Sequence, residues 1–408
     1  MMALLPLEEA KARLLEHVEP ISQRETVALC DANGRVLAAD LVARLTQPPF
    51  VASAMDGYAL RASDATRVGT ELSVIGTAAA GHPFAGSVGV GEAVRIFTGA
   101  PVPQNADTVI MQEDVLADGD QRISMKIAAV KGRHVRPLGQ DFTDGETVLA
   151  ADTCLDFSHL TVAAAMNHPL LTVYRRPKVA LLATGDELRL PGDSPSNGQI
   201  IASNPYGISA LIKDNGGEVL DLGIVPDRRE RIAEAVDTAR RQGADVLVTL
   251  GGASVGDHDL VQATLKGVGM KLDFWRIAMR PGKPLMVGAF DDMQVLGLPG
   301  NPVASLVCGL LFLEPLLRRL ARLPERKRGS QAITAADIAA NNHRQDFLRA
   351  RLSRDQEGNL VAQAHQKQDS SMMKVFATSD ALIIRKPHAP LLPAGAPCPI
   401  LLLRPLSI

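Results

Sequence analysis

The stretch Asp245-Val-Leu-Val-Thr-Leu-Gly-Gly-Ala-Ser-Val-Gly-Asp-His-Asp259 decides the fold. Its first half is a short apolar run that ends in a glycine pair, which is typical of a strand buried on both faces of a parallel sheet. Its second half is small and polar and carries the carboxylates Asp257 and Asp259 before a helix-like segment. This order places both carboxylates at the carboxyl edge of a sheet, where open α/β sheets bind their ligands.

Two more loops of the same kind follow along the chain. They are Arg280-Pro-Gly-Lys283-Pro and Leu298-Pro-Gly-Asn-Pro302, and each joins glycine and proline to a charged or amide side chain. We interpret the three loops as one site. Glycine turns with free N–H groups, and the helix start at Asn301-Pro302, suit phosphates and other oxyanions.

Strands and helices alternate around these loops, from residue 178 to about residue 323. Helices are expected to begin at Ser203 and Asp227, and Asn301 should cap a long apolar helix that reaches Leu320. The expected strands are the runs at 178–183, 218–223, 245–250, 284–289 and 295–298, together with Trp275 and its neighbours. This alternation predicts a central α/β domain with a mostly parallel sheet.

Outside residues 178–323, the sequence does not alternate between strands and helices. Residues 7–18 have the apolar spacing of an amphipathic helix. Residues 70–150 are rich in Gly, Val and Thr with many short runs, which indicates a small β-rich domain with tight turns. After a charged linker at 324–329, short alternating strands predict a final small β domain.

Composition narrows the class of protein. The 408 residues are 46% hydrophobic and 22% charged, so the chain has ample core for several domains. A net charge of -2 and 3% aromatic residues disfavour nucleic-acid binding. The four cysteines have no Cys-x-x-Cys spacing, and no apolar run approaches the ~20 residues of a membrane span. We therefore expect a cytoplasmic protein with no membrane partner.

The charged and glycine-rich loops favour binding of an anionic ligand. The glycines lack dinucleotide and P-loop spacing, and no histidine pair has zinc spacing. Asp257 with Asp259, or Asp186 with Glu187, could hold magnesium through one or two carboxylates plus phosphate oxygens. Arg280 and Lys283 could neutralise a substrate. Two like charges ~4 Å apart repel by roughly 4 kcal/mol at an effective dielectric of 20, so joining two anions requires fixed cations.

Structural alternatives exist for several of these side chains. Asp227 lies three residues before Glu230 and could simply cap its helix. Asp257 or Asp259 could be an acid of a helix start without a metal. Asp186 could be a turn residue, and Arg280 a surface charge.

Six motifs together resemble the molybdopterin molybdenumtransferase family, which includes the MoeA proteins and is related to the C-terminal part of gephyrin. They occur in family order and cover nearly the whole chain: Ser53-Ala-Met-Asp-Gly-Tyr-Ala59, Thr98-Gly-Ala-Pro-Val-Pro103, Thr184-Gly-Asp-Glu-Leu188, Gly251-Gly-Ala-Ser-Val-Gly256, Pro281-Gly-Lys-Pro284 and Gly297-Leu-Pro-Gly-Asn-Pro302.

The resemblance implies four domains. These are a discontinuous N-terminal domain at 1–45 plus 141–176, an inserted β-rich domain at 46–140, an α/β molybdopterin-binding domain at 177–326, and a C-terminal β barrel at 327–408. It also implies a homodimer, whose active cleft takes residues from both subunits, and a molybdopterin adenylyltransferase as upstream partner.

The implied reaction takes adenylylated molybdopterin and molybdate to molybdenum cofactor and AMP, with magnesium. The residues carried over by motif fall into three groups. Those expected to be catalytic are Asp56, Glu187, Asp259, Arg280 and Lys283. Those expected to bind substrate are Thr98, Arg136, Asp227, Gly251, Gly252, Ser254, Pro299, Gly300, Asn301 and Ser370. Those expected to hold metal are Asp141, Glu187, Asp257 and Asp259.

Three positions depart from the family pattern. Arg280 stands where lysine is usual, so a planar fork replaces a point charge. Gln140 replaces a common glutamate, which weakens a metal role there. Asp369 replaces a usual glycine beside Ser370, and its carboxylate would repel a phosphate.

Two other functions are alternatives to the predicted transferase. A scaffold of the same fold would tolerate alanine at Asp56, Glu187, Asp259 and Lys283. A molybdopterin adenylyltransferase shares a similar α/β domain, but the inserted and C-terminal domains favour the insertion reaction.

Overall fold

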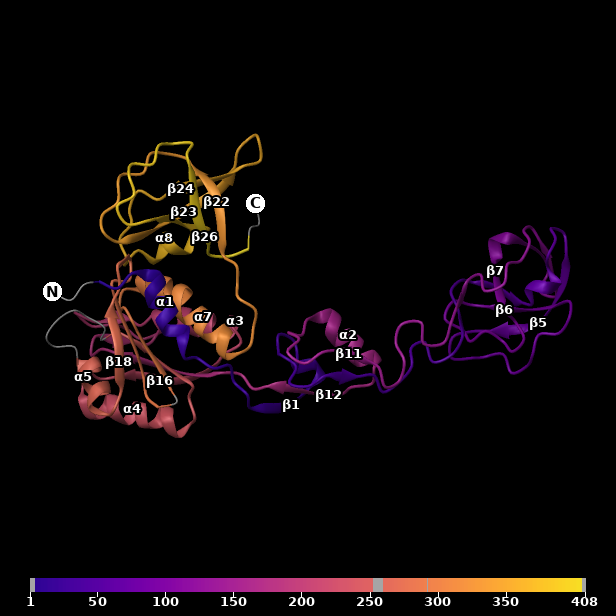
Figure 1. Cartoon of the computed structure of the whole chain (residues 1–408), viewed down its shortest axis with the longest axis horizontal. Coiled ribbons are helices and arrows are strands. Elements are labelled where there is room, and N and C mark those ends of the chain that lie inside the picture. Colours follow the sequence, from indigo (N-terminus) through magenta and orange to yellow (C-terminus); the bar gives the residue numbers. More distant parts are fainter. Residues whose placement is uncertain (1–3, 252–259, 292, 406–408) are drawn as a thin grey trace. The chain divides into compact units, whose positions relative to one another are not determined.

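The computed structural model describes residues 4–251, 260–291 and 293–405, and the chain divides into two compact units (Figure 1). Unit 1 comprises Met1–Arg24 and Tyr174–Ile408, and unit 2 comprises Glu25–Val173.

A six-stranded sheet forms the centre of unit 1. Its order is β16 (Glu218–Val225), β13 (Lys178–Thr184), β17 (Val246–Leu250), β21 (Gln294–Leu298), β20 (Pro284–Ala289) and β18 (Lys271–Arg276). All residues of β17 are buried, and β17 pairs in parallel with β13 and β21. This confirms the strand predicted from the Val/Leu run before Gly251. The sheet is mixed because β20 runs antiparallel to both β21 and β18.

Helices cover both faces of this sheet. On one face lie α1 (Leu7–Glu16), α3 (Asn204–Asp214), α6 (Pro302–Cys308) and α7 (Glu314–Leu320), with the five-residue π-helical segment Gly309–Leu313 joining α6 to α7. On the other lie α4 (Arg229–Arg241) and α5 (Leu260–Gly267), as Figure 1 shows. In α4, Ile232, Val236 and Ala239 are buried, and this i, i+4, i+7 spacing fixes which side of the helix meets the sheet.

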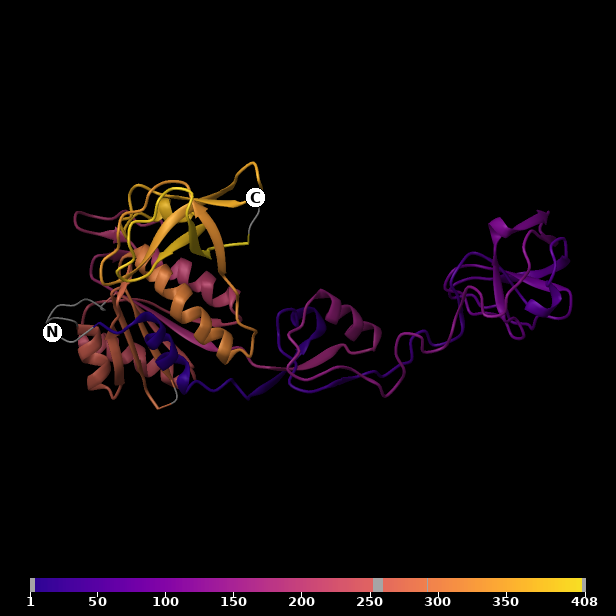
Figure 2. The ribbon, with the colours of Figure 1, turned by 45° about the horizontal axis from the view of Figure 1, so that its top comes forward.

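The C-terminal residues of unit 1 form a closed barrel, yellow in Figure 2, above the helices. The ring runs β23 (Gln345–Arg354), β24 (Leu360–Ala364), β22 (Gly329–Thr334), β26 (Pro397–Leu402) and β25 (Ala381–Arg385), which pairs again with β23. A helix, α8 (Met373–Ala377), interrupts it, and the short β19 (Met279–Arg280) adds to β23 from the central domain. Two further short strands, β14 (Leu188–Arg189) and β15 (Ile200–Ile201), pair in parallel.

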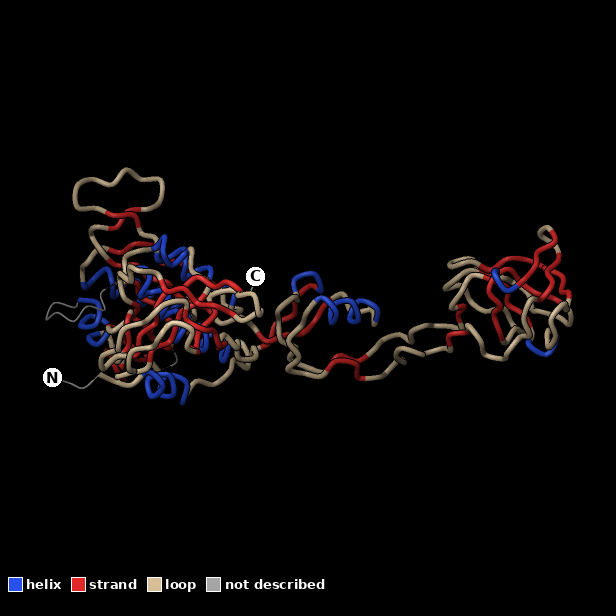
Figure 3. Tube along the Cα trace, turned by 90° about the horizontal axis from the view of Figure 1, so that it is seen from above, coloured by secondary structure: helices blue, strands red, loops and turns tan. Residues whose placement is uncertain are grey.

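Unit 2 contains a six-stranded sheet and smaller pairings. The sheet order is β7 (Thr108–Met111), β4 (Gly57–Leu60), β6 (Glu92–Ile96), β5 (Glu71–Ala78), β9 (Arg122–Met125) and β8 (Val115–Asp118). Figure 3 shows that strands and loops dominate this part of the chain. The small pairs join β1 (Arg24–Ala28) to β12 (Leu170–Tyr174), β2 (Leu41–Val42) to β11 (Thr147–Leu149), and β3 (Ala52–Ser53) to β10 (Val135–Arg136), and α2 spans Phe157–Ala165.

The predicted fold class is confirmed: an α/β multi-domain chain with an inserted β-rich part and a C-terminal β barrel. Within the described residues, no helix has the length and apolar character needed to cross a membrane.

Candidate functional site

A pocket of about 1270 Å³ opens at the carboxyl ends of β13, β17 and β21 in unit 1. Several loops predicted from the sequence to form one site border it together. The residues of the predicted set that line it are Glu187, Asp227, Gly251, Pro299, Gly300 and Asn301. Gly252, Ser254, Asp257 and Asp259 were predicted for the same edge and lie outside the described residues.

Gly251 lets the end of β17 lie close to the end of β13 beside the pocket, whereas Gly300 leaves room for an ordinary contact. Gly251 has φ +94°, and a Cβ added there would lie 3.1 Å from the Thr184 carbonyl oxygen. A Cβ added at Gly300 would lie 3.8 Å from the Gly251 Cα. A side chain at Gly251 would therefore be strained and would crowd the neighbouring strand, so the sequence keeps glycine where the backbone must pass.

Three acids gather at one side of the pocket. Asp227 and Glu187 line it, and the Asp227 backbone N–H donates to the Asp186 carboxylate at 3.3 Å. Burial raises the pKa of Asp227, and the nearby charges of Asp186 and Glu187 raise it further. The N-cap position of α4 is Arg228, without a side-chain cap bond, so the structure does not support the alternative that Asp227 caps the helix.

These acids fit a magnesium ion bound largely by substrate oxygens. Within the described residues, no three His, Cys, Asp or Glu side chains converge closely enough to enclose a metal ion by themselves. Magnesium in phosphate sites is commonly held by one or two carboxylates plus phosphate oxygens. A carboxylate whose pKa is raised by neighbouring negative charge gains most from a cation. Glu187 and Asp227 therefore have the chemistry for such a site.

The C-terminal barrel completes the pocket rim through Ser371 and Met373. Asn301 occupies the N-cap position of α6, but its side chain donates to the Ser370 hydroxyl at 3.0 Å instead of capping the helix. The Val303 N–H of the first helical turn donates to the Ser370 carbonyl at 3.1 Å. The sequence-predicted residues Asn301 and Ser370 are thus brought together, and they tie the barrel to the helix start.

The predicted cations lie in different environments. Arg280 binds the buried carboxylate of Asp346 on β23 through Nε, at 2.9 Å from Oδ1, and through Nη2 to the second oxygen. Half of the Arg280 side chain is nevertheless exposed. Lys283 is half-buried and forms no side-chain hydrogen bond or ion pair with the described part of the chain. Among the described residues, Arg280 thus has a carboxylate partner and Lys283 has none.

A third cation was missed by sequence reasoning. Arg349 on β23 is 1% exposed, and its Nη2 donates to the Asp369 carbonyl at 3.1 Å. Its Nε has no hydrogen-bond partner, and among described residues no carboxylate forms an ion pair with it. Burial lowers the pKa of Arg349. In the sequence, Arg349 is one polar residue within the alternating strand β23. Only the structure shows that its position in the strand is a buried one.

The Asp369 carboxylate, a departure from the family pattern, is occupied locally. It accepts from the Ser371 N–H at 2.8 Å and from the Ser371 hydroxyl at 2.6 Å. These bonds lower the pKa of Asp369, so the group is a carboxylate at neutral pH. Its charge is turned toward its own loop, which reduces the repulsion expected for a phosphate near Ser370.

Unit 2 holds a second group of predicted residues. Oδ1 of Asp56 accepts from both the backbone N–H and the hydroxyl of Thr98, each at 2.7 Å. The two bonds lower the pKa of Asp56, with a smaller contribution from the Arg95 charge. Asp56 precedes β4 and Thr98 follows β6, and these strands are neighbours in the sheet. The pairing explains how motifs 42 residues apart meet.

Arg136 and Asp141 lie on loops of the same unit. Arg136 pairs across from Ala52 on β3, in the segment that leads to Asp56. Asp141 is exposed, and its backbone N–H donates to the Gln47 carbonyl at 3.0 Å. Among the described residues, the Asp141 carboxylate belongs to no group of three potential metal ligands, so a metal role for Asp141 stays a prediction.

Three family profiles match successive parts of the chain. "MoeA N-terminal region (domain I and II)" matches residues 5–167, "Probable molybdopterin binding domain" matches 180–319, and "MoeA C-terminal region (domain IV)" matches 331–403.

Relatives and solved structures agree with these profiles. The chain is 35% identical to a molybdopterin molybdenumtransferase of Haemophilus influenzae, over 93% of this chain and 94% of that protein. It is 33% identical to the enzyme of that name from Bacillus subtilis, over 93% and 90%. A crystal structure of a MoeA molybdopterin biosynthesis protein from Pyrococcus horikoshii superposes with a TM-score of 0.81 at 29% identity, covering 99% of this chain and 100% of that one.

Proposed function

The chain belongs to the molybdopterin molybdenumtransferase family, and we propose that it inserts molybdenum into molybdopterin. The substrates are adenylylated molybdopterin and molybdate, and the products are molybdenum cofactor and AMP, with magnesium as the required ion. The observation that carries the proposal is the likeness to the Haemophilus influenzae enzyme along 94% of its length. The pocket at the sheet edge supplies chemistry that suits anionic reactants.

Each part of the pocket has a task in this proposal. The backbone at Gly251 and Gly300 and the start of α6 offer N–H groups to oxyanions. Glu187 and Asp227 would hold magnesium, which supplies positive charge to the phosphate oxygens of the adenylylated substrate. Lys283 does not line the pocket, but it directly precedes the lining residue Pro284. In this proposal its charge neutralises molybdate as the anion approaches the phosphorylated substrate, because two anions repel each other unless a fixed cation lies nearby.

The Asp56–Thr98 pair has a different task. Its bonded carboxylate stays ionised at neutral pH, so it serves as a fixed acceptor and not as a proton donor. Its second oxygen, Oδ2, has no hydrogen-bond partner among the described residues and can accept from substrate or contact a cation. We propose Arg136 as a further substrate-binding residue on the neighbouring strand.

The assay that tests the function offers purified protein adenylylated molybdopterin, molybdate and magnesium, and follows AMP together with reconstitution of a molybdenum enzyme. Release of AMP should require both molybdate and magnesium. Release that is unchanged without molybdate, or absent in the full mixture, contradicts the proposal. The reverse reaction, formation of adenylylated molybdopterin from ATP, tests the adenylyltransferase alternative.

We further propose a homodimer, a four-domain organisation with the boundaries given above, and a cytoplasmic location. In the proposed dimer, Asp56 and Lys283 of one active site come from different subunits. An upstream molybdopterin adenylyltransferase would hand over the substrate, since the adenylylated pterin must be made by such a reaction.

Subunit mixing tests the dimer. Asp56→Ala and Lys283→Ala chains should each be inactive alone. If they are co-refolded, heterodimers carry one intact site each, so random pairing should restore about one quarter of the wild-type sites. No recovery, in a sample shown by mass to contain heterodimers, places both residues in the same subunit's site.

A further inference from the structure

Arg95 on β6 is a cation that is held in place without an ion pair. Among the described residues no carboxylate pairs with it, and its one side-chain hydrogen bond runs from Nη2 to the side-chain oxygen of Gln112, a neutral acceptor, at 2.5 Å. Its guanidinium carbon lies 4.9 Å from the centroid of the Tyr58 ring and 5.2 Å from the centroid of the Phe97 ring. Two cation–π contacts and one hydrogen bond therefore fix this charge.

The sheet of unit 2 explains why these groups meet. Arg95 and Tyr58 are direct partners across the antiparallel pair of β4 and β6, so their side chains lie on the same face. Phe97 follows two residues after Arg95, and side chains two apart along an extended chain point the same way. Gln112 directly follows β7, which pairs with β4 on its other side. The register of three neighbouring strands thus places the cation.

The same contacts bring Arg95 near Asp56. Gln112, whose side chain accepts from Arg95, donates its backbone N–H to the Asp56 carbonyl at 3.2 Å. Asp56 also lies two residues before Tyr58. The hydrogen bonds from Thr98 lower the pKa of Asp56, and the charge of Arg95 lowers it further. Arg95 therefore acts on the Asp56 carboxylate through space and does not bind it.

The Asp56 loop has further charged neighbours. The Ala54 N–H donates to the His134 carbonyl at 2.9 Å, which brings the segment 133–136 beside the loop. The titratable side chains of that segment and of the turn after β7 are Arg133, His134, Arg136, Glu113 and Asp114. Of the charged residues that the structure describes, only Arg95 shifts the pKa of Asp56 through its charge.

A cation held at this range suits a carboxylate that must stay open to a ligand. A direct ion pair would occupy the carboxylate oxygens. The two rings and Gln112 instead hold the guanidinium back, and Oδ2 of Asp56 keeps no hydrogen-bond partner among the described residues. An anionic reactant brought near Asp56 would repel its carboxylate, and a fixed cation nearby offsets part of that repulsion.

We propose that Arg95 is a positioning residue of the reaction, a fixed counter-charge that keeps the Asp56 carboxylate ionised and open beside anionic reactants. This inference rests on the proposed function, because that function brings a phosphorylated substrate and molybdate to Asp56. Arg95 acts through Asp56 and touches neither reactant.

Arg95→Gln removes the charge and keeps a polar side chain. The acid limb of the pH–rate profile for AMP release should move to higher pH, because the pKa of Asp56 rises when the neighbouring cation is lost. At pH 7 and low ionic strength, kcat/KM for the adenylylated substrate should fall about two- to fivefold, the size usual for an exposed charge interaction. Added salt should shrink this loss, since it screens charges that lie outside direct contact.

Two further variants separate charge from packing. Arg95→Lys keeps the charge and loses most of the stacking on the rings, so it should retain the wild-type acid limb and most of kcat/KM. Arg122→Gln is the matched control. It removes an exposed arginine of the same sheet, on β9, that pairs with Glu71 at 3.7 Å, and it should change neither the profile nor kcat/KM.

An NMR titration of the Asp56 carboxyl in the substrate-free protein gives a readout that does not depend on turnover. Its pKa should be higher in Arg95→Gln than in wild type, and the same as wild type in Arg122→Gln. An unmoved carboxyl pKa in Arg95→Gln overturns the inference. So does a loss of kcat/KM that is equally large in Arg95→Lys and insensitive to salt, because Arg95 then only supports the two rings. Wild-type protein that fails to release AMP contradicts the proposed function instead, and the titration distinguishes the two failures.

Discussion

Two carboxylates of this chain, Asp227 in unit 1 and Asp56 in unit 2, lie in opposite electrostatic environments. Asp227 lies near two other acids, and its pKa is raised by burial and by their charge. Asp56 accepts two hydrogen bonds from Thr98, and its pKa is lowered. Both stand in short loops next to strands, Asp227 after β16 and Asp56 before β4, so the position beside a strand does not by itself set their behaviour.

The two pKa shifts differ because different groups stabilise the two carboxylate charges. The Asp56 carboxylate is already stabilised by its own protein, which fixes one oxygen and leaves the other for a ligand. The acids of the pocket in unit 1 repel one another and are stabilised only when positive charge arrives. One carboxylate is thus held by hydrogen bonds from its own unit, and the other lies among like charges.

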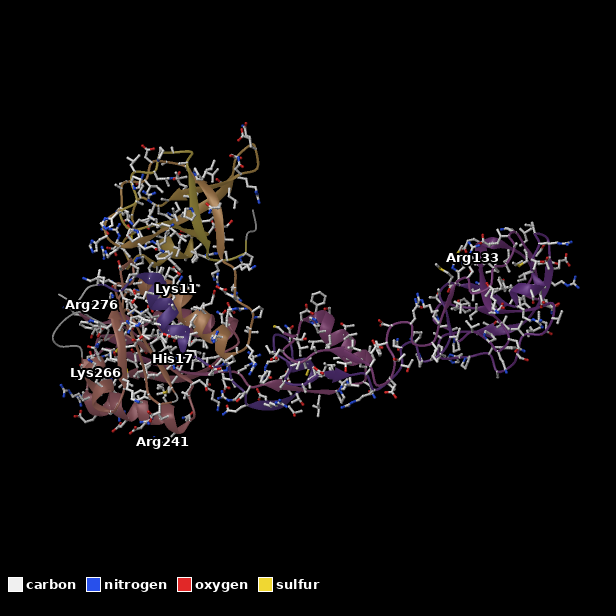
Figure 4. The ribbon with its side chains drawn as sticks, viewed as in Figure 1. Lys11, His17, Arg133, Arg241, Lys266 and Arg276 are labelled. Atoms are coloured by element: carbon white, nitrogen blue, oxygen red, sulfur yellow. The ribbon has the colours of Figure 1, made fainter. Side chains whose placement is uncertain are left out.

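The largest expected effect is on Lys283, the cation proposed to accompany the pocket acids. Lys283→Ala should reduce molybdate-dependent AMP release by at least about a hundredfold, because removing one preorganised charge stabiliser commonly has this effect. Lys266→Ala, which removes an exposed lysine of α5 (Figure 4), is the control and should leave turnover unchanged. Normal turnover of Lys283→Ala, with unaltered thermal unfolding in both variants, removes Lys283 from the mechanism.

Next in size is the response of the pocket acids to magnesium. Asp227→Asn should raise the magnesium concentration for half-maximal activity by about ten- to hundredfold, as loss of a metal-site partner does. A matched variant, Asp221→Asn, changes an exposed acid of β16 that does not line the pocket and should titrate as wild type. If Asp227→Asn also titrates as wild type, the acids of the pocket do not hold the ion.

The same Asp227→Asn variant has a stability signature whose sign follows from the raised pKa. A carboxyl with a raised folded pKa favours folding at low pH and disfavours it once the pH passes that pKa. Without magnesium, Asp227→Asn should therefore melt higher than wild type at pH 7. The gap should close as the pH falls and the wild-type carboxyl becomes protonated. A variant that melts lower at pH 7 contradicts the repulsion described here.

Much of this arrangement followed from the sequence, for physical reasons that particular residues show. The Val/Leu run of β17 and the helix start at Asn301-Pro302 are local patterns, and both elements lie where the sequence predicted them. The helix expected to reach Leu320 is divided into α6, the π-helical segment Gly309–Leu313 and α7, and the Asn301 side chain does not cap it. The short alternating strands predicted after the linker at 324–329 include β24 and β25. Period-2 and period-3.6 patterns survive folding because they decide which side is buried.

Other features could not be read from the sequence because they depend on partners distant in the chain. The bond between Arg280 and Asp346 joins residues 66 positions apart. The antiparallel course of β20 was also missed, since a buried strand reads the same in both directions.

A smaller effect is expected at the preorganised site of unit 2. Thr98→Val removes the hydroxyl bond to Asp56 but keeps the backbone N–H bond, so the pKa of Asp56 should rise part of the way toward its ordinary value. The acid limb of the pH–rate profile should move to higher pH, with turnover at pH 7 reduced by about tenfold or less. Thr98→Ser is the control and should restore the wild-type profile. A profile unchanged in Thr98→Val shows that the ionisation of Asp56 does not limit the reaction.

The smallest effect on turnover is expected at Arg280. Here the comparison lies within unit 1, between Arg280, which is paired with Asp346, and Lys283, which has no partner among the described residues. Its guanidinium is held by the buried carboxylate of Asp346 through two nitrogens, an arrangement that an ammonium cannot copy. Arg280→Lys keeps the charge and should preserve turnover within about twofold, while lowering the free energy of unfolding by about 1 kcal/mol through the lost second hydrogen bond.

Asp346→Asn should lower the free energy of unfolding by a similar amount, and the double variant should add little, because both single changes break the same interaction. Urea unfolding of the four proteins measures this coupling. Additive losses would mean that Arg280 and Asp346 act independently. A loss of turnover in Arg280→Lys as large as that in Lys283→Ala would mean that the paired cation, too, acts on the substrate.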